Sequence, residues 1–117
     1  MVESYERLLA WRECHRLVIA TYRATRSFPD GERFGLVSQT RRAAFSAAAN
    51  IVEGSLRRSK REFRRFLNIS HASLGELGYG LLVARDAEML TQEGWGELND
   101  LRQRASFLVW RLFQSLA

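Results

Sequence analysis

The chain has 117 residues, 46% of them hydrophobic, with 18 lysines and arginines against 13 aspartates and glutamates. This length suits one domain, residues 1–117, with enough apolar side chains for a buried core. A single cysteine excludes an internal disulfide, and no apolar run approaches the roughly 20 residues that a membrane span needs. The first residues are acidic and lack a signal-peptide pattern, so we expect a soluble, cytoplasmic protein without membrane partners.

The first half of the chain shows the apolar periodicity of two helices. The first helix should run from about residue 5 to residue 27 and end at Phe28-Pro29-Asp30-Gly31, because proline and glycine both interrupt helices. After a short connector, the second should cover residues 36–53. Gly54-Ser55 is expected to stop it.

The second half predicts two further helices. Ser59 and Glu62 have the spacing of a capping box for a helix over residues 60–89, and Thr91 can cap a fourth helix. The third helix contains three glycines between residues 75 and 80, which indicate either close packing of another backbone or a local break. No strand alternation is present. Four helices with short connections predict an all-α, antiparallel up-down-up-down four-helix bundle.

The second helix combines small residues with a polar stripe. Its alanines allow a neighbouring helix to come close. The stripe consists of Arg42, Ser46, Asn50 and Glu53, which share one helical face. We expect it to meet Ser73 and Glu76 of the third helix, with Arg42 and Glu76 as an ion pair. A buried polar network that fixes the helix register is favoured over a small functional site, because buried polar groups normally satisfy one another.

The end of the fourth helix is apolar on nearly every side. Phe107, Trp110 and Phe113 lie outside the stripe that faces the core. A helix of this kind is buried on more than one side, and an exposed patch of this size would promote aggregation. We therefore expect these three residues to lie in a homo-oligomer interface.

The net charge is concentrated in one window of nine residues. Residues 57–65 hold six basic residues and one acid, which gives +5, and the rest of the chain has 12 of each sign. The six, here called the basic cluster, are Arg57, Arg58, Lys60, Arg61, Arg64 and Arg65. Basic residues are unfavourable at a helix N-terminus, because the helix dipole is already positive there. The same position favours a bound phosphate, since the free N–H groups and the bidentate arginine side chains can both donate hydrogen bonds to it. We predict that the cluster binds RNA or DNA backbones with little sequence preference, assisted by Arg41 if that residue is exposed. The alternative is a scaffold that binds an acidic protein partner.

No catalytic or metal constellation is found in the sequence. His15 and His71 lack the Glu-x-x-His spacing of a di-iron bundle, and Cys14 with His15 supplies too few ligands for zinc. No nucleophile, base and orienting group converge. We expect no catalytic residues, no metal and no cofactor, and hence a protein that is not an enzyme.

Several short motifs together resemble one protein family. They are Gln39-x-Arg41-Arg42-Ala43, Ser46, Asn50-Ile51-x-Glu53-Gly54, Arg57-x-Ser59, Phe66-Leu67-x-Ile69 and Ser73-Leu74-x-Glu76-Leu77. In this order they resemble the small four-helix-bundle proteins named after intervening sequences in 23S ribosomal RNA genes. The resemblance implies a homopentamer. It also implies kinship with the accessory proteins of diversity-generating retroelements, which are basic barrels that bind nucleic acid and a reverse transcriptase.

Overall fold

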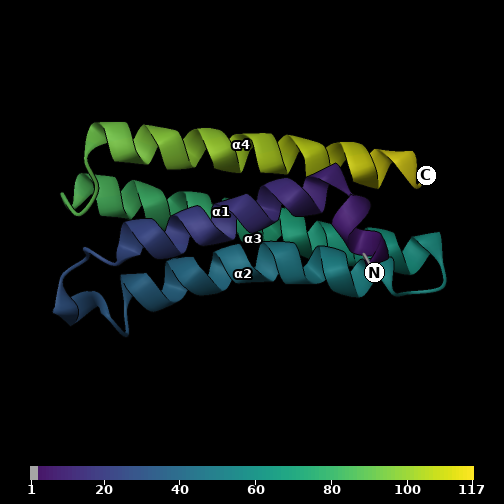
Figure 1. Ribbon diagram of the computed structural model, residues 1–117, viewed down its shortest axis with the longest axis horizontal. Coiled ribbons are helices and arrows are strands. Elements are labelled where there is room, and N and C mark those ends of the chain that lie inside the picture. Colours follow the sequence, from purple (N-terminus) through teal and green to yellow (C-terminus); the bar gives the residue numbers. More distant parts are fainter. Residues whose placement is uncertain (1–2) are drawn as a thin grey trace.

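The computed structural model describes residues 3–117, and Met1 and Val2 lie outside the described residues. Two of its elements are short 3-10 turns, η1 (Ser4–Arg7) and η2 (Asp30–Glu32). The four α-helices are α1 (Leu9–Thr25), α2 (Leu36–Ser55), α3 (Lys60–Asp86) and α4 (Gln92–Ser115). Successive α-helices run in opposite directions (Figure 1). The prediction of an all-α bundle of four helices is confirmed for this part of the chain.

Each α-helix packs against two others, so the four form a closed ring of neighbours. α1 and α3 both contact α2 and α4, whereas α2 and α4 do not contact each other. The bundle measures 43 × 24 × 22 Å. The start of α1, the α2–α3 connection and the end of α4 lie at one end, on the right in Figure 1, which we call the α2–α3 end. The α1–α2 and α3–α4 connections lie at the other end, the α1–α2 end.

The core is built from leucines of α1 and α3 against small side chains of α2. Fully buried large side chains include Leu17, Ile51, Leu67, Leu74, Leu77, Leu81 and Val109. Ala44 and Ala47 of α2 are at most 1% exposed, and they leave room for α3 to approach. The hydroxyl of Ser70 on α3 donates to the carbonyl oxygen of Ala47 at 2.7 Å. The alanines therefore permit the close approach of two helices that the sequence predicted.

The first helix differs from the prediction at both ends. Leu8 has extended backbone (φ −79°, ψ 122°) and separates η1 from α1. The prediction of one continuous helix from residue 5 is therefore wrong. Glu3 and Glu6 form a capping box in which the Glu3 N–H donates to the Glu6 carboxylate at 2.8 Å, and this box stabilises the separate 3-10 turn. α1 ends at Thr25, and the buried Phe28 precedes Pro29, which disfavours helical backbone at the residue before it.

Gly54 does not stop the second helix. α2 continues through Gly54 and Ser55, and Gly54 has no positive φ. A Cβ atom at Gly54 would lie 2.8 Å from Cδ1 of Phe63 and 2.9 Å from Cβ of Phe66. The glycine is needed because α3 passes close to α2 at this turn, not because the backbone must turn there.

The glycines of α3 lie in an unbroken helix. A Cβ at Gly78 would meet the Arg102 side chain at 2.7 Å, and one at Gly80 would meet Thr40 at 2.8 Å, whereas one at Gly75 would meet nothing within 4 Å. Side chains, not another backbone, therefore approach two of these positions. α3 ends at Asp86, three residues earlier than predicted, because Glu88 adopts a left-handed φ of 63°. No helix within residues 3–117 is long and apolar enough to cross a membrane.

Candidate functional site

The basic cluster lies at the α2–α3 end, on the connection between these helices and the first turns of α3 (Figure 1). Ser59 caps α3, and its hydroxyl accepts a hydrogen bond from the Glu62 N–H at 3.1 Å. The cap confirms the predicted start of α3. It also places Lys60 and Arg61 in the first turn, where the free N–H groups of the helix already favour an anion.

Carboxylates of the same chain leave most of the basic cluster free. Within residues 3–117, one ion pair involves the cluster, from Arg65 Nε to the Glu62 carboxylate at 2.8 Å, and both side chains are largely exposed. Arg57, Arg58, Lys60 and Arg61 are exposed, and Arg64 is half-buried. An exposed pair of this kind is weak and screened by salt. The cluster therefore keeps its positive charge available to a ligand.

Aromatic rings hold three of the guanidinium groups in place. Arg64 lies 4.1 Å from the ring centroid of Phe113 on α4, and Arg57 and Arg65 lie 4.9 and 4.5 Å from the ring centroid of the buried Phe66. Cation–π contacts of this type contribute about 0.5–2 kcal/mol, depending on how far they are desolvated. The Nε of Arg64 is buried and has no hydrogen-bond partner among the described residues. The rings thus orient the guanidinium planes without neutralising them.

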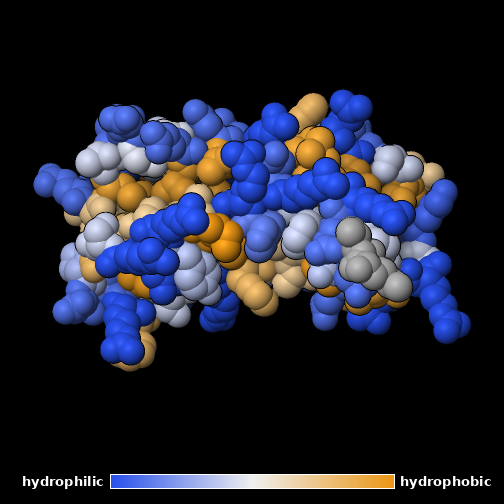
Figure 2. Space-filling model, viewed as in Figure 1, coloured by the Kyte–Doolittle hydropathy of each residue, from blue (hydrophilic) through white to orange (hydrophobic). Residues whose placement is uncertain are grey.

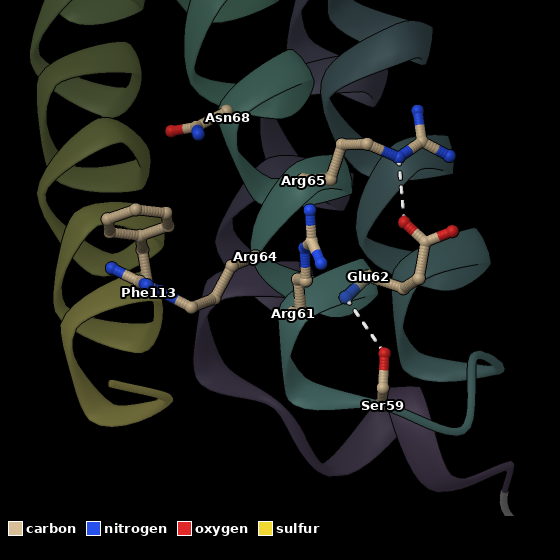
Figure 3. Close-up of a pocket in the computed structure, with 7 residues that line it drawn as sticks. All are labelled: Ser59, Arg61, Glu62, Arg64, Arg65, Asn68 and Phe113. Atoms are coloured by element: carbon tan, nitrogen blue, oxygen red, sulfur yellow. Dashed lines mark hydrogen bonds and ion pairs between the residues drawn. The ribbon is translucent and has the colours of Figure 1, made fainter.

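A shallow depression of about 710 Å³ lies beside these arginines. Figure 3 shows Arg64 extending across it toward Phe113, while Arg65 turns the other way to Glu62. Seven residues line it, namely Ser59, Arg61, Glu62, Arg64, Arg65, Asn68 and Phe113. A phosphate in this depression would meet guanidinium and amide N–H donors together. Asn68 and Phe113 were missed as site residues, although Asn68 follows Arg61 and Arg64 by seven and four positions and so shares their helical face.

Of the residues that the structure describes, Glu62 is the one carboxylate that lines this depression. The hydrogen bond from Arg65 is the largest cause that lowers the pKa of the Glu62 carboxyl, and the charges of Arg65, Arg57 and Arg61 lower it further. Glu62 therefore stays ionised at neutral pH. Its charge offsets that of Arg65 and leaves the remaining basic residues uncompensated.

Arg41 lies apart from the basic cluster, so it does not line the same depression, and its predicted part in nucleic-acid binding stays a prediction. It lies in the first half of α2, about 20 Å along the helix from the α2–α3 connection. Its Nε donates to the Thr25 hydroxyl at 2.8 Å, and its guanidinium carbon lies 4.6 Å from the ring centroid of Tyr22. Arg41 connects α2 to α1 near the α1–α2 end.

In the polar stripe of α2, the middle residues form hydrogen bonds to α3 and to each other, whereas the charged residues face solvent. The hydroxyls of Ser46 and Ser73 are 2.8 Å apart, and Asn50 Nδ2 donates to the Ser46 hydroxyl at 3.0 Å. Among the described residues no ion pair joins Arg42 to Glu76, and the predicted pair is wrong. Arg42, Glu53 and Glu76 are exposed, because these charged side chains turn toward solvent.

The aromatic residues at the end of α4 differ in exposure. Phe107 is 47% exposed and Trp110 is 49% exposed. Phe113 is half-buried, carries Arg64 on its ring and stacks with Trp110 at 5.7 Å between centroids. Phe113 thus belongs to the basic depression, while Phe107 and Trp110 form the apolar outer surface of α4.

His15 packs against an aromatic ring, and Cys14 is buried in the core. No group of three or more His, Cys, Asp or Glu residues within residues 3–117 is placed to hold a metal ion. His15 stacks on Trp11 with ring centroids 5.0 Å apart. Burial, assisted by the charge of Glu13, raises the pKa of the Cys14 thiol to about 12. A thiol with this pKa is protonated and unreactive at neutral pH.

The fold and this surface define an all-α four-helix bundle that displays a dense group of guanidinium groups at one end. The model of the 23S rRNA-intervening sequence protein family matches residues 6–109, and the chain belongs to that family. The resemblance drawn from the sequence motifs is therefore confirmed.

One solved structure shares the fold along nearly its full length. It is the crystal structure of a protein of unknown function from the S23 ribosomal protein family of Bacteroides thetaiotaomicron. The two chains are 20% identical, the match covers 90% of this chain and 98% of that one, and the TM-score is 0.81. At this identity the likeness shows the fold alone. A comparison with curated proteins finds no match.

Proposed function

We propose that this protein is a non-enzymatic accessory protein that binds the backbone of RNA or DNA through its basic cluster. The observation that supports this most is that residues 57–65 carry a net charge of +5, and that one exposed ion pair joins the basic cluster to a carboxylate within residues 3–117. Guanidinium forks held over Phe66 and Phe113 suit phosphate oxygens, which accept two parallel N–H bonds. Contacts of this kind position a backbone and carry no base information, so weak sequence preference is expected.

The proposal includes a ring of identical subunits, a homopentamer, as the family resemblance implies. A closed ring needs two different surfaces on each subunit that fit each other. The outer side of α4 offers Phe107 and Trp110, and an apolar groove between α1 and α2 offers Trp11, Ala49 and Val52. α2 does not contact α4, so these surfaces lie on different sides of the bundle. Figure 2 shows hydrophobic side chains exposed between the hydrophilic ones on the face that includes α1.

A ring would also multiply the basic cluster. Several copies of one cluster facing the same direction form a multivalent surface, whose avidity exceeds the affinity of one site by orders of magnitude. Such a surface fits a long polyanion better than a small anion. By the same resemblance, a reverse transcriptase or another protein bound to the nucleic acid is the expected further partner.

The test compares nucleic acid with an acidic protein-like chain. The Arg61→Glu, Arg64→Glu, Arg65→Glu variant is measured against random-sequence RNA, random-sequence DNA and poly-glutamate of similar charge. We expect the wild type to bind both nucleic acids more tightly than poly-glutamate, and the variant to lose that binding. Equal or tighter binding of poly-glutamate would instead support a scaffold for an acidic protein partner.

A further inference from the structure

A second surface that combines arginines with exposed rings lies at the α1–α2 end. We call it the aromatic–arginine surface, and it consists of Tyr22, Arg33, Phe34, Arg41 and Arg42 around a depression of about 580 Å³. Phe34 is 87% exposed and Tyr22 is 40% exposed. An exposed phenylalanine is ordinary on its own, but here it lies beside a second ring and three cations.

Arginines already lie over the rings of this surface. The Arg33 guanidinium carbon is 5.4 Å from the Phe34 ring centroid, and that of Arg41 is 4.6 Å from the Tyr22 ring centroid. Arg41 is held there by its hydrogen bonds to the Thr25 hydroxyl at 2.8 Å and to the Tyr22 carbonyl oxygen at 3.3 Å. These contacts fix flat groups in the surface before any ligand arrives, which lowers the entropy that binding costs.

Among residues 3–117, no carboxylate lines this depression. In the α1–α2 connection, the Glu32 carboxylate accepts a hydrogen bond from the Leu36 N–H at 3.1 Å at the start of α2. Arg42 is exposed and makes no ion pair within residues 3–117. The surface is therefore positive and apolar at once, and it is complementary to a ligand that is negative and flat.

We propose that the aromatic–arginine surface binds a short stretch of single-stranded nucleic acid, with bases stacked on Phe34 and Tyr22 and phosphates on Arg33 and Arg42. A duplex hides its base faces, so it would use the arginines alone. A single strand supplies both phosphates and free base faces, and aromatic stacking of this kind is tolerant of sequence. Phe45 lines the same depression, so the surface extends about 16 Å from Phe34, just before α2, to Phe45 within α2, the length of about five stacked nucleotides.

This site is separate from the basic cluster, because the second half of α2, about 15 Å from Phe45 to Ser55, lies between them. Either site can therefore fail without the other. A strand that occupied both would run along the bundle from the α2–α3 end to the α1–α2 end (Figure 1). The inference adds single-strand recognition to a proposed function that otherwise involves the backbone only.

The test uses a labelled single strand of about five nucleotides, matched to the length of the surface, and a duplex of the same sequence. Phe34→Leu removes the flat ring, Phe34→Tyr keeps it, and Tyr79→Leu is the control, since Tyr79 is an exposed aromatic residue on α3. We expect Phe34→Leu to weaken single-strand binding about tenfold. Phe34→Tyr and Tyr79→Leu should retain it, and the duplex should be affected little by any of the three.

Repeating the measurement with Arg61→Gln, Arg64→Gln and Arg65→Gln separates the two sites. If Phe34→Leu still weakens the short single strand in that background, the aromatic–arginine surface binds it independently of the basic cluster. Equal effects of Phe34→Leu and Tyr79→Leu would overturn the inference and leave the basic cluster untouched. The inference would also be overturned if poly-glutamate bound as tightly as the single strand and Phe34→Leu weakened both to the same extent. That result would favour an acidic protein partner.

Discussion

The guanidinium carbon of Arg64 lies 4.1 Å from the ring centroid of Phe113, and this contact joins the start of α3 to the end of α4. Phe113 stacks in turn with Trp110, with the ring planes 18° apart. The three side chains form one stack that begins in the basic depression and ends on the exposed side of α4. A change in this stack should therefore affect ligand binding without removing charge.

Arg64→Lys tests whether the flat guanidinium matters as well as its charge. Lysine keeps the positive charge but has neither the bidentate fork nor the planar face that stacks on Phe113. We expect a several-fold weaker affinity for random-sequence RNA and an unchanged slope of affinity against salt. Arg58→Lys is the control, because Arg58 is exposed and has no ring beneath it among the described residues. Equal effects of the two substitutions would show that the stack does not position the site.

Gly54→Ala tests the close passage of α3 over α2. The added methyl group would lie within 2.9 Å of atoms of Phe63 and Phe66, one of them the Phe66 Cβ, which is tied to the backbone. We expect the free energy of unfolding to fall by about 1–3 kcal/mol, as in overpacked cores. Urea unfolding at a fixed protein concentration measures it.

Gly75→Ala is the matched control for that substitution. Gly75 lies within α3, and a Cβ there meets nothing within 4 Å. Alanine is the better helix former by about 0.5–1 kcal/mol, so this variant should be more stable than the wild type. A destabilised Gly75→Ala, or a neutral Gly54→Ala, would contradict the packing described for these helices.

The predictions from sequence were correct for features that depend on nearby residues, such as helix caps. They were wrong where a contact between residues far apart in the sequence decides the structure. The capping serine and threonine, Ser59 and Thr91, bind the N–H groups that their spacing predicts. The alanines of α2 also pack as expected. Gly54, however, has the sequence signature of a helix stop. Gly54 is needed because α3 passes close to it, and the residues next to Gly54 in the sequence do not indicate this contact.

The same limit explains the errors in the candidate sites. The spacing of the polar stripe predicts that its members share a face, and Ser46, Asn50 and Ser73 do meet. Spacing shows which residues share a helical face, but not whether that face is turned toward a neighbouring helix or toward solvent. The ion pair predicted between Arg42 and Glu76 is therefore not formed among the described residues. The depression beside Phe113 depends on α4 ending next to α3, and this relationship appears once the helices are packed.

Cys14 should report whether the bundle is intact. Burial and the neighbouring Glu13 raise the pKa of its thiol to about 12, whereas an unfolded thiol has a pKa of about 8.5. Folding thus favours the protonated thiol, and this contribution to stability is complete below about pH 8.5 and declines as the pH rises toward 12. Iodoacetamide at pH 8 should leave the folded protein unlabelled and modify it fully in denaturant. Rapid stoichiometric labelling of the folded protein would contradict the burial of Cys14.

Phe107→Ser with Trp110→Ser tests the proposed subunit interface on α4. These side chains are 47% and 49% exposed in the single chain, and polar replacements should prevent their burial against a second copy. Native mass spectrometry should give five copies for the wild type and a mass near 13.5 kDa for the double variant. Tyr79→Ser removes an exposed aromatic residue from α3 and should leave the mass unchanged. A wild-type monomer, or an unaltered assembly in the double variant, would refute this interface.

The most direct test of the central claim is the affinity for random-sequence RNA measured over a range of salt concentrations. Each phosphate contact contributes roughly 0.7–0.9 to the slope of log affinity against log salt. We predict a steep slope for the wild type that becomes shallower by roughly two or three when Arg61, Arg64 and Arg65 are all replaced by glutamine. A shallow slope for the wild type, or one that these replacements leave unchanged, would contradict phosphate binding by the basic cluster.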